Sequence, residues 1–258
     1  MTSVRHVTVA ALAVHVSLGT VSSLLFLAAF GFRIDWLLEP ARLVEGGPHA
    51  AALFRWAAVA DLYSYYLPVG LVAIVLWFVL RHRNEPLATA GLVGALGYVL
   101  LGGAGASVLA LAGAPLIESF ADPAADHATV RTLFATLIDV VFRAVWQFVD
   151  LILLATWMTS TALLLRRDRP GLARLSLVLG GLFTVVAALT LLGLGLARDA
   201  LLGVVFVLWI AWSVWVAVLV WRLEPPFDDL ETVRRSSRND PRTIGPDDRP
   251  EPIEGRTR

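Results

Sequence analysis

The chain has no cysteine and no lysine, and charged residues make up only 16% of its 258 positions. Without cysteine it forms no disulfide, thiolate metal site or cysteine nucleophile. Soluble domains carry about 25% charged residues, so this fraction argues against a soluble protein. The 21 basic and 21 acidic residues cancel, and a net charge of zero gives no support for nucleic-acid binding.

Hydrophobic residues account for 57% of the chain and gather in long runs. A helix needs about 20 apolar residues to cross about 30 Å of hydrocarbon. We therefore predict an all-α polytopic membrane bundle of six transmembrane helices. The predicted spans are residues 7–30, 57–80, 90–111, 137–165, 172–197 and 201–221. The first run is longer than the apolar part of a signal peptide and lacks a small-residue cleavage site, so we interpret it as a retained span.

Arginines are unevenly divided between the loops on the two sides, which predicts the orientation. One side holds Arg5, Arg81, Arg83, Arg166, Arg167, Arg169, Arg174 and Arg222. The other side holds Arg33, Arg42, Arg55, Arg131 and Arg198. Both termini are therefore predicted to be cytoplasmic. The abundance of alanine and leucine, with arginine as the sole strong base, indicates a GC-rich bacterial genome and hence the bacterial cytoplasmic membrane.

The chain divides into two regions of different composition. Residues 1–222 form the predicted transmembrane domain. Residues 223–258 are rich in proline, arginine and acidic residues and have few large apolar side chains. Such a segment buries too little surface to offset chain entropy, so we predict a disordered cytoplasmic tail.

Four polar residues interrupt the fourth span: Asp139, Arg143, Gln147 and Asp150. Their spacing of four, four and three residues places them on one face of an α-helix. Ionisable groups inside a bilayer are costly and face the bundle interior or a wet cavity. This polar stripe is therefore the candidate intramembrane site.

Depth along the helices suggests partners for two of these residues. Asp61 and Arg143 lie about one turn inside the outer ends of their spans, at about 1.5 Å per residue. We expect them to form an ion pair, with Asp139 bracing the arginine one turn away. Such a pair more often fixes helix register than performs chemistry.

Asp150 lies deeper, and His15 on the first span is its expected partner at comparable depth. A histidine–carboxyl pair inside the membrane could relay protons. In the alternative interpretation Asp150 is protonated or hydrogen-bonded to a hydroxyl or a backbone carbonyl. His15 has no second histidine at matching depth on another span, which argues against a bis-histidyl haem, and we predict no cofactor.

Other features predict architecture. Glycines of the third span, from Gly91 to Gly105, should let a neighbouring helix approach closely, and Pro68 should kink the second. Tyr63, Tyr65 and Tyr66 fit an aromatic belt at the outer surface. Trp209, Trp212 and Trp215 are interpreted as a packing ridge, and residues 197–200 as the turn between the last two spans.

The outer loops, predicted at residues 31–56 and 113–136, carry the remaining candidates. Glu118, Asp122, Asp126 and His127 are hard ligands, but their spacing matches no known metal site. We interpret Asp122-Pro123 and the neighbouring alanines as turn and cap residues and predict no metal.

Three stretches resemble a known family. LFRWAAVADL at residues 53–62 and LRHRNEPLA at residues 80–88 are similar to the second-helix region of the bacterial membrane family called domain-of-unknown-function 4386. LLRRDRPGLARL at residues 164–175 resembles its junction between the fourth and fifth helices. The resemblance implies a six-helix inner-membrane protein of unestablished activity.

The sequence shows none of the common nucleotide-binding, metalloprotease or serine-hydrolase motifs. It favours a non-enzymatic accessory or regulatory protein that contacts lipid and a membrane-protein partner or a second copy of itself. Two alternatives stay open. One is a small proton-coupled transporter that uses Asp150 and His15, and the other is an enzyme that acts on a lipid.

Overall fold

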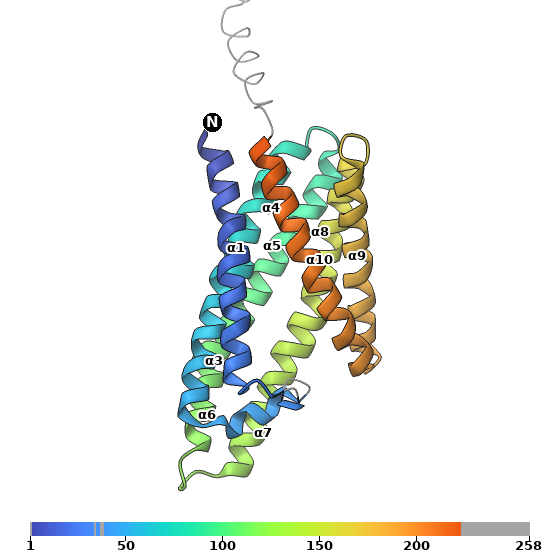
Figure 1. The fold of residues 1–258 in the computed structure, drawn as a ribbon. Coiled ribbons are helices and arrows are strands. Elements are labelled where there is room, and N and C mark those ends of the chain that lie inside the picture. The colour runs from blue at the N-terminus through green and yellow to red at the C-terminus, as the bar shows by residue number, and fades with distance from the viewer. Residues whose placement is uncertain (1, 34, 37–38, 223–258) are drawn as a thin grey trace, which may run out of the picture. The chain divides into compact units, whose positions relative to one another are not determined.

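The computed structural model describes residues 2–33, 35–36 and 39–222, and this part of the chain contains helices and no strand. The tail predicted at residues 223–258 lies outside the described residues. Six long helical stretches run alternately up and down (Figure 1). The first is α1 (Thr2–Ala29), and the last two are α9 (Pro170–Leu191) and α10 (Gly195–Arg222).

The three stretches between them are each built from several pieces. The second comprises a 3-10 turn (Pro40–Gly46), α3 (Gly47–Asp61), a π-helical segment (Leu62–Tyr66) and α4 (Leu67–Leu80). The third comprises α5 (Glu85–Val108), a π-helical segment (Leu109–Gly113) and α6 (Ala114–Phe120). The fourth comprises α7 (His127–Ile138), a π-helical segment (Asp139–Val149) and α8 (Asp150–Leu165).

Five of the six stretches are long and apolar enough to cross a membrane. They are His6–Ala29, Pro40–Leu80, Glu85–Phe120, Pro170–Leu191 and Gly195–Trp221. The stretch left out of this set contains the polar stripe. The predicted all-α fold is thus confirmed, and the protein has the helices of a membrane-embedded chain.

The middle stretches are much longer than predicted. Pro40–Leu80 has 41 residues and Glu85–Phe120 has 36, whereas about 20 residues cross the hydrocarbon. The outer loops predicted at residues 31–56 and 113–136 are therefore wrong, because most of those residues are helical. Two of these helices begin at recognisable residues: α3 has a proline near its first position, and α7 is capped by Asp126. Hydropathy detected only the apolar portions of these helices.

The extra length lies at one end of the molecule, where α3, α6 and α7 extend beyond the ends of α9 and α10 (Figure 1). We call this part the extended end, formed by residues 40–58 and 109–138. The opposite end, with the turns at residues 81–84 and 166–169, is the arginine-rich end.

The extended end has its own hydrophobic core. Leu43, Phe54, Ile117 and Phe134 are completely buried there, and they come from four different helical pieces.

Ion pairs link the helical pieces around this core. Arg55 binds Glu118 at 3.1 Å between α3 and α6, and Arg131 binds Glu45 at 3.0 Å. The combination of a buried apolar core and an ion-paired surface is typical of a part that faces water.

The glycines of α5 allow close approach of neighbouring helices, as predicted, and Gly91, Gly94 and Gly97 lie against α8. A Cβ atom added at Gly94 would lie 2.6 Å from the backbone oxygen of Leu153, and one at Gly91 would lie 3.0 Å from the Cβ of Ser160. These glycines therefore serve a contact inside the chain.

The turn between the last two helices differs from the prediction. It lies at residues 192–194, and Gly193 adopts φ +71° there. Glycine tolerates this left-handed conformation after a helix end, so α9 ends earlier than its hydropathy suggests. Arg198 and Asp199 fall in the first turns of α10, where they form a 2.8 Å ion pair.

Candidate functional site

The polar stripe lies on a π-helix over most of its length. Residues 139–149 are π-helical, and a wider turn no longer places residues four apart directly above one another. Asp139 and Arg143 form a 3.2 Å ion pair on the surface, with 58% and 59% of their side chains exposed. Asp150, by contrast, is 2% exposed. The four residues thus wind from the surface to the interior and do not share one face.

The expected ion pair between Asp61 and Arg143 is not formed. The Arg143 guanidinium instead binds Asp139, one turn away on the outside of the bundle. Asp61 is 9% exposed and accepts a hydrogen bond from the Ser22 hydroxyl at 3.3 Å. The same hydroxyl also lies 3.0 Å from the carbonyl oxygen of Ala57, so Ser22 joins α1 to α3.

The expected pair between His15 and Asp150 is also absent, because both ring nitrogens of His15 have other partners. The Trp209 indole donates to Nε2 at 2.7 Å, and Nδ1 lies 3.0 Å from the carbonyl oxygen of Ser64. An indole N–H can only donate. His15 is therefore neutral with its proton on Nδ1, which donates to Ser64.

Pro68 explains why the Ser64 carbonyl needs this donor. Ser64 is four residues before Pro68, and the proline nitrogen has no hydrogen for the α-helical bond. A kink was predicted at Pro68, and the structure has the π-helical segment Leu62–Tyr66 shortly before this proline. His15 supplies the missing donor from α1, and it links α1, the second stretch and α10 at one point.

Asp150 is the exception among these buried polar groups. Neither of its carboxyl oxygens has a hydrogen-bond partner among the described residues, and the buried Oε1 of Gln147, one turn earlier, has none either. Most buried polar atoms in folded proteins are hydrogen-bonded. These three acceptor oxygens therefore need an explanation beyond packing.

Four further residues lie within contact or electrostatic range of Asp150, and together with it they form what we call the carboxyl cluster: Asp61, Tyr66, Tyr98 and Gly102. The rings of Tyr66 and Tyr98 lie 4.9 Å apart, and both tyrosines are close enough to Asp150 to interact electrostatically. Asp61 interacts with Asp150 in the same way. The cluster thus joins two carboxyl groups and two phenols from the second, third and fourth helical stretches.

Sequence reasoning missed the two tyrosines and the glycine. Tyr63 is 54% exposed and fits the predicted aromatic belt, but Tyr66 is 3% exposed and faces the interior. A signal was present in the third span, because Tyr98 and Gly102 are four residues apart and hence share a helix face. It indicated a neighbour that approaches closely but did not identify Asp150.

The acidic residues of the second outer loop have structural partners. Asp126 caps α7 by accepting from the backbone of Ala128 and Thr129 and from the Thr129 hydroxyl at 2.7 Å. The hydroxyl bond, together with the backbone bonds, lowers the pKa of Asp126. Asp122 accepts from the backbone nitrogen of Ala124 at 2.9 Å. The interpretation of Asp122 as a turn residue is confirmed, and the structure adds Asp126 as the cap of α7.

Trp209 and Trp212 confirm the predicted packing ridge. They are 6% and 1% exposed and their rings stack 5.6 Å apart. Trp212 also donates to the Ser176 hydroxyl at 2.9 Å, which joins α10 to α9. Trp215 is 45% exposed.

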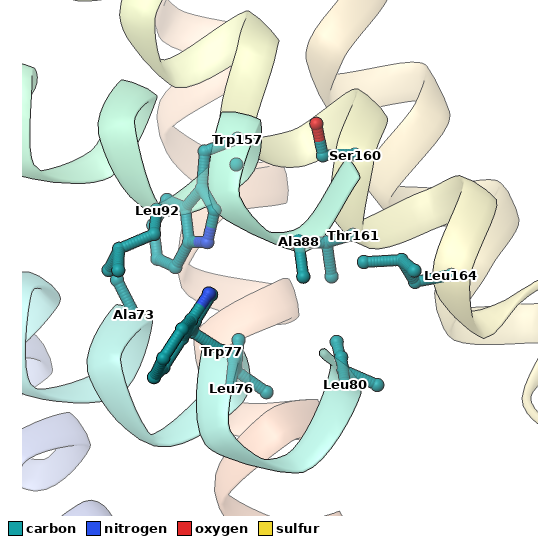
Figure 2. A pocket seen from close by; sticks show the side chains of 11 residues that line it. Ala73, Leu76, Trp77, Leu80, Ala88, Leu92, Trp157, Ser160, Thr161 and Leu164 are labelled. Carbon is teal, nitrogen blue, oxygen red and sulfur yellow. The ribbon is translucent and has the colours of Figure 1, made fainter. Parts of the chain in front are cut away.

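A small groove lies between α4, α5 and α8 near the arginine-rich end (Figure 2). It is lined by residues that include Trp77, Trp157 and Thr161, and its volume is about 10 Å³. This is about the space of one water molecule. The groove is therefore too small for an organic substrate in this conformation.

Comparison of the chain with protein-family models, curated proteins and solved structures gave no match. The assignment of function therefore rests on the geometry of the molecule.

Proposed function

We propose that the protein is a non-enzymatic integral membrane protein that acts as an accessory or regulatory subunit. The observation that carries this proposal is the extended end. Its helices continue well beyond the length that crosses hydrocarbon, and they carry a separate core and an ion-paired surface. A rigid surface outside the bilayer is what a partner can recognise.

The proposed partner is another membrane protein or a second copy of this chain, within a lipid bilayer. The glycines of α5 from Gly91 to Gly105 do not supply the contact, since they pack against other helical pieces of the same chain. The proposed location is the bacterial cytoplasmic membrane with both termini cytoplasmic, as the arginine distribution indicates. Membership of the domain-of-unknown-function 4386 family belongs to the same proposal, and the six helical stretches agree with the architecture that the family implies.

Inside the bundle, most polar groups have structural tasks, which supports a role without catalysis. His15, Ser22 and Ser176 each join two or more helices by hydrogen bonds. Two of the carboxylates that a lipid enzyme could use are instead held in ion pairs. Asp139 pairs with Arg143, and Glu118 pairs with Arg55.

A proton-coupled carrier is the second candidate, and one observation favours it. Asp150 is a buried carboxyl group without a hydrogen-bond partner among the described residues, and ionisable groups at such depth often belong to proton pathways. His15 does not take part in the proposed proton transfer, because both of its ring nitrogens are already hydrogen-bonded.

Proton flux in proteoliposomes distinguishes the two candidates. Vesicles that contain a pH-sensitive dye would be compared for the wild type, Asp150→Asn and a matched control, Asp139→Asn, under an imposed membrane potential. For an accessory protein we expect flux equal to that of protein-free vesicles in all three cases. Flux in the wild type and the control that Asp150→Asn abolishes would overturn the proposal in favour of the carrier.

A further inference from the structure

We propose that Asp150, within electrostatic range of Asp61, binds one monovalent cation, either a proton or Na⁺, inside the helix bundle. The site is built on the carboxyl cluster, and Gln147, one turn before Asp150, carries a further buried oxygen without a hydrogen-bond partner among the described residues.

The unpartnered atoms at this site all share one chemical character. Both carboxyl oxygens of Asp150 and the Oε1 of Gln147 are buried acceptors without a donor among the described residues. A group of acceptors is satisfied by a donor or a cation, and not by an anion or an apolar ligand. Carboxyl and amide oxygens are also the ligand types that hard cations prefer.

The surroundings of the cluster supply no positive charge. The second stretch contributes Asp61 and Tyr66, and Tyr65 lies beside them, whereas α5 contributes Tyr98. Between Leu175 and Leu191, α9 has no ionisable side chain.

The two bases that the sequence suggested as partners for Asp150 and Asp61 are both occupied. His15 of α1 is held neutral by Trp209 and Ser64, and Arg143 is bound to Asp139 at the surface. A buried carboxylate without a counter-ion is very costly. Neutrality at the site therefore requires a cation from solution, and a bound proton is the smallest.

The position of the Asp150 carboxyl group is also fixed in advance. A Cβ atom at Gly102 would lie 2.4 Å from Oδ2 of Asp150 and 2.1 Å from Cε1 of Tyr66, so a glycine is needed for the carboxyl group to occupy this position. Asp61 is held in turn by Ser22 at 3.3 Å. The two acids are thus fixed by three helical stretches and α1, which is the preorganisation that a small ion requires.

This inference does not depend on the proposed function. A bound cation could stabilise an accessory protein as well as serve a carrier, and binding is measured here without any flux. Failure of the flux experiment and failure of the binding experiment therefore report on separate claims.

The test is thermal unfolding of the full chain in a neutral detergent. Wild type would be compared in sodium chloride and in choline chloride at equal ionic strength, across the range from about pH 5 to about pH 8. A cation that binds only the folded state raises the unfolding temperature in a saturable way. We expect a rise of several degrees with Na⁺, or, if the ion is a proton, a rise as the pH falls and no effect of Na⁺.

Variants assign the effect to the cluster. Asp150→Asn and Asp61→Asn should each remove the dependence on Na⁺ or pH, and Asp139→Asn, which alters an exposed carboxylate on the same stretch, should keep it. If the buried variants do not fold, infrared spectra of the wild type still test the idea, because the bands of a buried carboxyl group must change when the ion is added. Dependence that persists in Asp150→Asn, or a wild type whose stability and infrared bands respond to neither ion, would overturn the proposal.

Discussion

Gly102 sits where three helical stretches meet around Asp150. An added methyl group there would overlap the Tyr66 ring and the Asp150 carboxyl group, at 2.1 Å and 2.4 Å. Gly181 on α9 provides a matched control, because a Cβ atom at that position meets nothing within 4 Å. Both glycines lie within α-helices, so the comparison isolates the close contact.

We expect Gly102→Ala to lower the unfolding temperature strongly, and Gly181→Ala to leave it unchanged or raise it slightly. The cost of overpacking is typically about 1–3 kcal/mol, whereas alanine in a helix gains about 0.5–1 kcal/mol over glycine. Thermal unfolding in detergent measures the unfolding temperatures of both variants and the wild type. Equal stability of Gly102→Ala and wild type would show that the cluster is looser than the structure indicates.

At the scale of single residues, the sequence predicted which polar residues are buried but not which groups they contact. Asp61, Asp150 and His15 are all buried, as expected for polar residues in apolar helices. Their proposed pairs were based on depth, and depth leaves open the direction in which a side chain points around the helix. The real partner of His15 is Trp209, which is 194 residues away along the chain. A pairing between residues so far apart along the chain depends on how the helices pack. The periodicity of one helix carries no information about that packing.

The long middle helices show why the ends of elements were harder to predict than their existence. Each predicted span overlaps one of the six observed helical stretches. High mean hydropathy marks the part of a helix that is apolar on all sides. Where the same helix continues as an amphipathic helix into water, its mean hydropathy is too low to be recognised as part of a span. Phe54 and Arg55 illustrate this, since adjacent residues of α3 face a core and an ion pair respectively.

The same two residues test whether the extended end is a packed unit. Phe54 is fully buried, with its ring centroid 5.7 Å from that of Phe26 and 6.2 Å from that of Phe134. Phe54→Ala should reduce the free energy of unfolding by about 3–5 kcal/mol. Arg55→Ala breaks a partly exposed ion pair with Glu118 and should cost less than about 1 kcal/mol.

Chemical unfolding of the two variants and the wild type, monitored by tryptophan fluorescence, gives the comparison. A similar loss for both variants would mean that ion pairs, and not the apolar core, hold the extended end together. No loss for Phe54→Ala would mean that this end contributes little to the stability of the bundle.

At the scale of the whole molecule, the alternation of the six helical stretches divides the turns into two groups. Residues 81–84 and 166–169 lie at the arginine-rich end, and residues 121–126 and 192–194 lie at the other. The helices fix this grouping but not which end faces the cytoplasm. The distribution of arginine predicts that the arginine-rich end does, because positively charged loops are retained on that side.

The lack of cysteine makes this orientation directly measurable. Single cysteines would be introduced at His82 and at Ala124, which are exposed residues of turns at opposite ends. A membrane-impermeant maleimide applied to intact cells should label Ala124→Cys, and it should label His82→Cys only after the membrane is permeabilised. The cysteine-free wild type gives the background. Labelling of His82→Cys alone in intact cells would reverse the orientation, and it would place the extended end, with its proposed partner surface, in the cytoplasm.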